Sequence, residues 1–298
     1  MFFVKTPESK EEFRQYYHFR WQTLRAPWRQ PEGSEQDELE AQATHRMIVD
    51  DSGRLVAVGR LHKVNQFQAQ IRYMAVDETI RGQGLGRLMI DALELQAAKE
   101  GVTEIMLNAR EVAVNFYRAL GYDTVEKTHV LYGEIQHYSM RKNISSNPQH
   151  QQALSDALTD TWHNTIPLSK AMNMRVSHYD DEQMITTTDV AFNKNLHNTM
   201  FAGSIYTQAT LTGWGWVYFQ LAKAQLAGDI VLADAQIKYF SPIAGPASGE
   251  VMRDHVEGDL SRLSKGKAAR MNINVNMRCG DKVAATFSGK YAIKPGHK

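Results

Sequence analysis

The chain has 298 residues, with 43% hydrophobic residues and a formal net charge of +1 at pH 7. This near-neutral balance excludes a polybasic tail for nucleic acid or membrane surfaces, and the length suits two domains of ordinary size. Cys279 is the single cysteine, which excludes a disulfide framework. The N-terminal residues lack the apolar core of a signal peptide, and glycines and a glutamine interrupt the longest apolar run, near residues 211–222. We therefore expect a cytoplasmic protein without membrane or nucleic-acid partners.

In the first half of the chain, strand and helix patterns alternate. The apolar spacing and the following glycines predict helices at residues 10–23, 85–100 and 112–120. The polar, acidic residues 30–43 are expected to form a loop that runs into a further helix. Strands are predicted at residues 45–50, 55–62, 71–76 and 104–109, with closing strands within 129–142. Residues 143–152 are polar, contain Pro148 and lack apolar periodicity, which predicts a linker.

A glycine-rich turn connects the predicted strand 71–76 to the helix that follows it. Glycines allow backbone N–H groups to approach a pyrophosphate, and the helix dipole adds a favourable field. A purely structural turn is the alternative. Two arginines flank the glycines, and a short motif on the next helix, Asn115-Phe116-Tyr117-Arg118, leads to Gly121-Tyr122. These additions favour an anion-binding cradle.

In this combination of motifs, residues 1–142 resemble the GNAT acetyltransferase family. The family's Arg/Gln-x-x-Gly-x-Gly/Ala motif corresponds here to Arg81-Gly82-Gln83-Gly84-Leu85-Gly86, followed by Arg87. The resemblance implies an acetyl-CoA or CoA site, with the pyrophosphate on residues 81–87 and pantetheine along the strand edge from Met74 to Val76. It also implies a cofactor contact from Asn115 and a general acid, Tyr117, for the leaving thiolate. No metal is expected.

The general base of such an acetyl transfer is left open by the sequence. Amine acetylation needs a group that takes a proton from the incoming ammonium, directly or through water. Glu111, His62 and His137 are candidates, and none of them lies in a motif that selects it. Each is equally compatible with a surface or hydrogen-bonded structural role. Binding of acetyl-CoA without catalysis is a further alternative for this domain.

The second half of the chain begins with a predicted helix at 151–164 and continues mainly as strands. Strands are predicted at residues 171–179, 183–191, 230–240, 247–253, 268–278 and 283–294, with one long apolar helix from 201 to 223. One buried helix wrapped by an antiparallel sheet resembles the hotdog fold. That resemblance implies a homodimer with sites between protomers. The expected organisation is an α+β chain, with a GNAT domain at 1–142, a linker at 143–152 and a hotdog domain at 153–298.

The segment from Asn195 to Thr210 is the candidate site of the second half. The asparagine amide and the free N–H groups of Ala202 and Gly203 at a helix start are suited to hold a carbonyl oxygen. The predicted helix contains no Asp, Glu, His or Cys, and Asn198 or Thr199 is expected to cap it. Chemistry at this point would therefore require an oxyanion site rather than a side-chain nucleophile. The structural alternatives are that Asn195 caps the helix or holds a loop, and that Thr210 is a core residue bonded to a backbone carbonyl.

Comparison with hotdog thioesterases sharpens this interpretation. Such enzymes often have His-Gly-Gly at the helix start, an acid nine residues later and an asparagine six residues earlier. In this chain the corresponding residues are Phe201-Ala202-Gly203, Thr210 and Asn195. The asparagine is retained, whereas the histidine and the acid are missing. Hydrolysis needs a carboxylate that attacks or activates water, which threonine does not supply.

Decarboxylation of a malonyl thioester needs no such carboxylate, because the enzyme must stabilise only the enolate that CO2 leaves behind. The fused arrangement resembles bacterial GNAT–hotdog proteins, often labelled thioesterase-like, and among them malonyl-acyl carrier protein decarboxylases. The resemblance implies a lyase that makes acetyl-acyl carrier protein for fatty acid synthesis, with an acyl carrier protein or CoA thioester as its partner. The alternatives are an N-acetyltransferase with a hotdog dimerisation module, an acyl thioesterase, and a CoA-sensing regulator.

Overall fold

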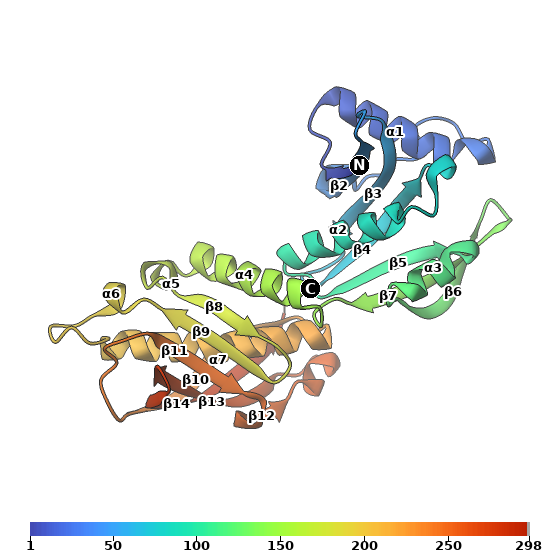
Figure 1. Cartoon of the computed structure of the whole chain (residues 1–298). Coiled ribbons are helices and arrows are strands. Elements are labelled where there is room, and N and C mark those ends of the chain that lie inside the picture. Colours follow the sequence, from blue (N-terminus) through green and yellow to red (C-terminus); the bar gives the residue numbers. More distant parts are fainter. Residues whose placement is uncertain (297–298) are drawn as a thin grey trace. The chain divides into compact units, whose positions relative to one another are not determined.

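The computed structural model describes residues 1–296, which form two compact units, residues 1–144 and the part of the chain from Ser145 onward (Figure 1). The connection between them is shorter than the predicted linker 143–152. Strand β7 (Ile135–Asn143) ends at Asn143, and helix α4 (Pro148–Thr165) begins at Pro148. Asn147 caps α4 through a hydrogen bond from the Gln149 N–H, and Pro148 occupies the first helical turn. The Asn-Pro pair is therefore a helix start.

The first unit is built on a seven-stranded sheet with the order β1-β2-β3-β4-β5-β7-β6. Besides β7, its strands are β1 (Phe2–Lys5), β2 (Thr44–Asp50), β3 (Leu55–Lys63), β4 (Gln68–Val76), β5 (Glu104–Arg110) and β6 (Asp123–Leu131). Its helices are α1 (Lys10–Leu24), α2 (Leu85–Lys99) and α3 (Val114–Ala119). Strands β4 and β5 pair in parallel, whereas the remaining neighbours pair antiparallel.

Helices α1 and α2 cover opposite faces of this sheet. Val58 of β3 packs against Tyr16 of α1, and both side chains are fully buried. The next residue, Gly59, faces α2, where an added Cβ would lie 2.9 Å from Leu93 and 3.0 Å from Met89. Successive strand residues point to opposite faces, so this alternation places the two helices on the two sides.

Strands β4 and β5 diverge halfway along their length. Their pairing covers Gln68–Ile71 opposite Glu104–Leu107 and stops there. Tyr73 has a left-handed backbone, with φ 54°, and the β3–β4 register shifts beside it. Beyond this bulge, β4 pairs only with β3, which leaves the edge from Met74 to Val76 without a strand partner among the described residues. A wedge therefore opens between β4 and β5.

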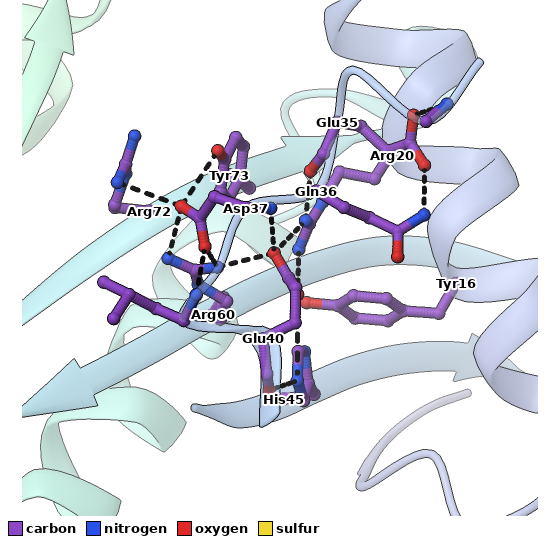
Figure 2. Close-up of polar contacts among 12 residues, drawn as sticks. Tyr16, Arg20, Glu35, Gln36, Asp37, Glu40, His45, Arg60, Arg72 and Tyr73 are labelled. Atoms are coloured by element: carbon purple, nitrogen blue, oxygen red, sulfur yellow. Dashed lines mark hydrogen bonds and ion pairs between the residues drawn. The ribbon is translucent and has the colours of Figure 1, made fainter. Parts of the chain in front are cut away.

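An ionic cluster, made of Arg20, Asp37, Glu40 and Arg60, joins α1, the 35–40 loop and β3 (Figure 2). Both arginine side chains are fully buried. Arg60 lies 2.5 Å from the carboxylates of Asp37 and Glu40, and Arg20 lies 2.5 Å from Glu40. Burial alone would raise the pKa of Asp37, but hydrogen bonds from Arg60 and the Leu39 N–H hold that pKa well below its usual range.

The second unit contains a sheet with the order β10-β14-β13-β11-β9-β8, and a short strand that pairs with β13. Its strands are β8 (Arg175–Tyr179), β9 (Gln183–Thr188), β10 (Gly228–Tyr239), β11 (Ala247–Met252), β12 (Val256–Asp259), β13 (Ala269–Cys279) and β14 (Lys282–Pro295). Besides α4, its helices are α5 (Pro167–Ala171), α6 (Val190–Asn193) and α7 (Ala202–Ala224). The long helix α7, orange in Figure 1, lies along this sheet. The predicted α+β class and the single long helix of the second unit are confirmed.

Glycines allow α7 to lie close to its neighbours. An added Cβ at Gly215 would lie 2.5 Å from Met184 of β9 and 2.9 Å from Trp162 of α4. At Gly213 it would lie 2.3 Å from the hydroxyl of Tyr291, which donates a hydrogen bond to the Thr210 carbonyl at 2.8 Å. Strand β14 therefore touches the backbone of α7. No helix among residues 1–296 combines the length and hydropathy needed to cross a bilayer.

We expect Gly213→Ala to destabilise the second unit although alanine is the better helix former. Alanine improves helix propensity by up to about 1 kcal/mol, but the clash with buried Tyr291 costs about 1–3 kcal/mol. Urea unfolding should therefore show a net loss of stability. Gly203→Ala is the matched control, because the three atoms nearest to the added methyl there all belong to the exposed ring of Phe201. Equal stability of the two variants would contradict this view of the α7 packing.

Candidate functional site

The glycine-rich turn of the first unit leads directly into α2. Gly82 and Gly84 have φ 84° and 81°, backbone angles that residues other than glycine rarely adopt. Gly84 is the N-cap of α2, and no side chain caps the helix. The first N–H groups of α2 are therefore available to an anion. Arg81 is exposed and lies 2.8 Å from Glu78, and Gln83 and Arg87 are also exposed.

The structure brings this turn together with the end of β4 and with α3. An added Cβ at Gly86 would lie 2.9 Å from Phe116 and 3.5 Å from Met74. The Tyr117 hydroxyl lies 3.6 Å from the Met74 sulfur. Asn115, on the same short helix, is exposed. Residues predicted from three separate segments therefore meet around the end of β4.

A cavity of about 230 Å³ occupies the wedge between β4 and β5. Tyr117 lines it and is buried. Burial raises the pKa of Tyr117 to about 12, against a smaller opposing effect of the Arg110 charge. The phenol therefore remains protonated at neutral pH. It is able to donate a proton to a leaving group inside the cavity.

Of the three candidate bases, His137 is the one that lines this cavity. Its Nδ1 lies 3.0 Å from the Ile135 carbonyl oxygen, which only accepts hydrogen bonds, so Nδ1 carries the proton. In the neutral ring, Nε2 is then the basic nitrogen. Burial lowers the pKa of His137, and the charges of nearby His129 and Arg110 lower it further, against a raising effect of the Ile135 hydrogen bond. His62 does not line the cavity, and exposed Glu111 accepts from Tyr138 at 3.1 Å.

In the second unit, Asn195 organises the turn that precedes α7. Its side-chain oxygen accepts from the N–H groups of His197 at 2.8 Å and Thr199 at 3.3 Å. Its amide nitrogen donates to the Thr199 hydroxyl at 3.1 Å. The side chain is half-buried. One amide hydrogen therefore remains available to a ligand.

Helix α7 begins without the predicted cap. Its N-cap is Phe201, which makes no side-chain capping bond, and neither Asn198 nor Thr199 occupies that position. Asn198 instead has a left-handed backbone, with φ 56°, in the Asn195 turn. The helix starts later than expected, at Ala202, so Met200 and Phe201 separate both residues from its first turn. Ala202 and Gly203 therefore present N–H groups in an uncapped first turn.

Thr210 lies eight residues after Ala202 in α7, which is about 12 Å along the helix axis at 1.5 Å per residue. One chain alone does not bring Thr210 against the helix start. Its hydroxyl is covered by protein and has no hydrogen-bond partner among the described residues. A buried hydroxyl without a partner is uncommon and costs free energy.

Two family models match the chain. The model "Acetyltransferase (GNAT) family" matches residues 13–122, and the model "Putative thioesterase (yiiD_Cterm)" matches residues 155–295. The chain therefore joins a GNAT-family domain to a YiiD-type thioesterase-like domain. This confirms the family resemblance for both halves, with the hotdog fold in the second.

Individual relatives match one domain each. The "Uncharacterized N-acetyltransferase YjcF" of Bacillus subtilis is 28% identical over 136 residues, which cover 46% of this chain and 96% of that protein. The "UPF0039 protein C11D3.02c" of Schizosaccharomyces pombe is 32% identical over 112 residues, or 37% of this chain and 74% of that protein. The crystal structure of a "putative thioesterase" from Shewanella oneidensis is 40% identical, with a TM-score of 0.47, and the match covers 48% of this chain and 99% of that one.

The GNAT domain also contains cavity residues that sequence reasoning missed. Arg25, Arg72 and Arg110 line the wedge, together with His129. They follow α1 or belong to β4, β5 and β6, and no motif connects them. One signal was available for Arg110, because it ends a strand with a parallel neighbour, and ligands often bind at the carboxyl ends of parallel strands.

Proposed function

We propose that the hotdog domain decarboxylates a malonyl thioester, with malonyl-acyl carrier protein as substrate and acetyl-acyl carrier protein as product for fatty acid synthesis. The observation that carries the proposal is an uncapped helix start that follows the turn organised by Asn195, in a helix without acids. Residues 202–224 contain no Asp, Glu, His or Cys. The site therefore offers oxyanion donors without a side chain that activates water, which favours decarboxylation over thioester hydrolysis.

In the proposed step, the bond between C2 and the carboxylate of the malonyl group breaks. Its electron pair forms the thioester enolate, CO2 leaves, and a proton from water then adds to C2. The Asn195 amide and the N–H groups of Ala202 and Gly203 stabilise the enolate oxygen. Thr210 of a second copy orients the carboxylate or the water, after a side-chain rotation that uncovers its unpartnered hydroxyl. An acid at this position would repel the substrate carboxylate.

The test is to incubate the full chain with malonyl-acyl carrier protein and to measure the mass of the carrier. An acetyl thioester supports the proposal. Free carrier thiol would instead indicate a thioesterase. Malonyl-CoA in place of the carrier substrate shows which thioester is preferred.

A homodimer follows from this arrangement, because Thr210 and the helix start must come from different copies. Strand β10 is suited to the interface, since its twelve residues pair only with β14 among the described residues. Val231, Tyr239 and Phe240 on and after this strand are 46%, 47% and 61% exposed. An exposed apolar edge strand is a template for pairing with another chain.

We expect Val231→Lys to convert a dimer into a monomer, because a charge on an edge strand opposes pairing. Light scattering coupled to size-exclusion chromatography measures the mass directly. Val64→Lys is the matched control, since Val64 is 50% exposed in the GNAT domain. A monomeric wild-type chain, or an unchanged dimer in Val231→Lys, would contradict the β10 interface.

A second activity, amine acetylation by the GNAT domain, is favoured by the placement of Tyr117 and His137 in one cavity. The free N–H groups at Gly84 and the open edge of β4 fit the pyrophosphate and pantetheine of acetyl-CoA. The amine attacks the thioester carbon, a C–N bond forms and the C–S bond breaks. His137 Nε2 takes the ammonium proton, directly or through water, and Tyr117 protonates the thiolate.

Tyr117→Phe should lower kcat for acetyl transfer about 100-fold, the usual contribution of a positioned general acid. The KM for acetyl-CoA should change little, because the ring that packs near Met74 remains. Release of free CoA during transfer to a panel of amines is the measurement. Tyr138→Phe, which removes an exposed hydroxyl bonded to Glu111, is the control. Equal rates in both variants would exclude Tyr117 as the acid.

A further inference from the structure

We propose that the cavity between β4 and β5 binds a carboxylate through Arg25 and Arg110, so that the GNAT domain takes a small carboxylate-bearing acceptor. The catalytic part of this inference rests on the proposed acetyl transfer. The carboxylate site itself rests only on the charges and contacts that line the cavity.

The cavity wall is cationic. Three arginines and two histidines line it, and no Asp or Glu does: Arg25, Arg72, Arg110, His129 and His137. They come from five different parts of the chain, so the positive charge does not belong to the solvent-facing side of a single helix or strand. The two acids near the cavity already have partners. Asp37 forms ion pairs with Arg60 and Arg72, and Glu111 accepts a hydrogen bond from Tyr138.

The three guanidinium groups differ in their partners. Arg72 lies 3.0 Å from Asp37 and is therefore balanced by an acid. Arg25 donates to the neutral Tyr132 hydroxyl at 2.6 Å, and its buried Nε has no hydrogen-bond partner among the described residues. Among the described residues, the Arg110 side chain donates a hydrogen bond only to the Leu24 carbonyl oxygen, at 3.5 Å. Neither Arg25 nor Arg110 forms an ion pair within residues 1–296.

Placing two unbalanced cations in the wall of one cavity is unfavourable without an anion. Burial lowers the pKa of Arg110, and the charge of Arg25 lowers it further. A carboxylate between the two side chains would pair with their terminal guanidinium nitrogens and offset this repulsion. Half-buried arginines are well suited to this, because the planar guanidinium binds a carboxylate through paired hydrogen bonds.

This wall also determines which amine suits the cavity. A polyamine or a lysine side chain would bring further positive charge against Arg25 and Arg110. An amino acid brings a carboxylate for the arginines and an amine for the basic Nε2 of His137. A carboxylate on the acyl group, as in malonyl-CoA, would use the same chemistry, and the test below distinguishes the two sources.

The test is calorimetric titration of the full chain, in the presence of CoA, with N-acetylated glycine, alanine and phenylalanine and with their neutral primary amides. Malonyl-CoA and acetyl-CoA are compared in a second arm without added CoA, in the Asn195→Asp chain, whose hotdog domain should neither hold nor decarboxylate the malonyl group. We expect at least one acid to bind about tenfold or more tightly than its amide, the effect of a charge-assisted hydrogen bond. A preference confined to malonyl-CoA would support the carboxylate site and assign it to the acyl group.

Variants connect that preference to the residues. Arg25→Gln and Arg110→Gln should each remove the acid-over-amide preference, and Arg110→Lys should retain part of it. Arg141→Gln, which changes a 45% exposed arginine outside the cavity, should leave it intact. Equal binding of acids and amides by the wild-type chain, with no preference for malonyl-CoA, would overturn the inference. So would a preference that survives in both glutamine variants.

Turnover separates this inference from the proposed acetyl transfer. With acetyl-CoA, amino acids should be acetylated with kcat/KM at least tenfold above the matching amines that lack the carboxylate. Acid-selective binding without any acetylation would refute the acetyltransferase activity and leave the carboxylate site standing. Preferential acetylation of the matching amines would overturn the carboxylate site.

Discussion

Asn195→Asp should reduce malonyl-thioester decarboxylation at least 100-fold while the hotdog domain stays folded. Aspartate keeps the oxygen that accepts from the N–H groups of His197 and Thr199, so the turn before α7 survives. It loses the amide donor, and removal of one oxyanion donor costs about 100- to 1000-fold in kcat. Its negative charge also repels both the malonyl carboxylate and the developing enolate. Initial rates and the melting temperature are the two measurements.

Asn198→Asp is the matched control for that variant. Asn198 lies in the same turn, is exposed and has a left-handed backbone that aspartate also tolerates. It introduces the same charge nearby without removing the Asn195 donor. We expect its rate to stay close to that of the wild type. Similar losses in both variants would assign the effect to local charge and contradict the oxyanion role of Asn195.

Arg60→Met should destabilise the GNAT domain by about 3–5 kcal/mol, the usual consequence of removing one partner from a buried ion pair. The methionine fills the space of the buried arginine stem, but it removes one arginine partner from each carboxylate, so Asp37 keeps Arg72 and Glu40 keeps Arg20. Urea unfolding, followed for each domain by pulsed hydrogen-exchange mass spectrometry, measures the loss. The hotdog domain should be unaffected.

The pH dependence of that loss has a definite sign. In the folded wild-type chain the pKa of Asp37 lies below its unfolded value of about 3.9. The ionised carboxylate therefore stabilises the fold at neutral pH, and this stabilisation is lost as the pH falls from the unfolded pKa toward the folded pKa. The penalty of Arg60→Met should therefore be larger at pH 7 than near pH 4. Arg72→Met is the control, since Arg72 is 40% exposed and should cost no more than about 1 kcal/mol. Equal penalties would contradict a special role of the buried arginine.

The predicted elements with strong local signals agree closely with the structure. Helix α1 begins with a capping box between Ser9 and Glu12, and the glycine-rich turn leads directly into α2. Elements with weaker sequence signals were missed or misassigned. Strand β1 has only four residues and was not predicted, and residues 171–179 divide between the end of α5 and β8 because Pro167 starts a short helix.

Tertiary contacts explain the remaining differences. Residues 30–43 were expected to run into a second helix, but they contain only a short 3-10 turn, Glu40–Gln42. The reason is that Asp37 and Glu40 form ion pairs with the buried arginines of α1 and β3. The cationic cavity was missed for a similar reason, since Arg25 and Arg110 are 85 positions apart (110 minus 25) and meet only in the fold. The roles of Asn195 and Thr210 stay predictions.

Decarboxylation of malonyl-acyl carrier protein in D2O tests the central proposal most directly. An enolate intermediate takes its new proton from solvent, so we expect an acetyl-acyl carrier protein that carries one solvent deuterium at C2. Acetyl-acyl carrier protein incubated with the same enzyme controls for exchange after the reaction. Unchanged malonyl thioester, release of free carrier thiol, or an acetyl product without deuterium would contradict the proposed mechanism.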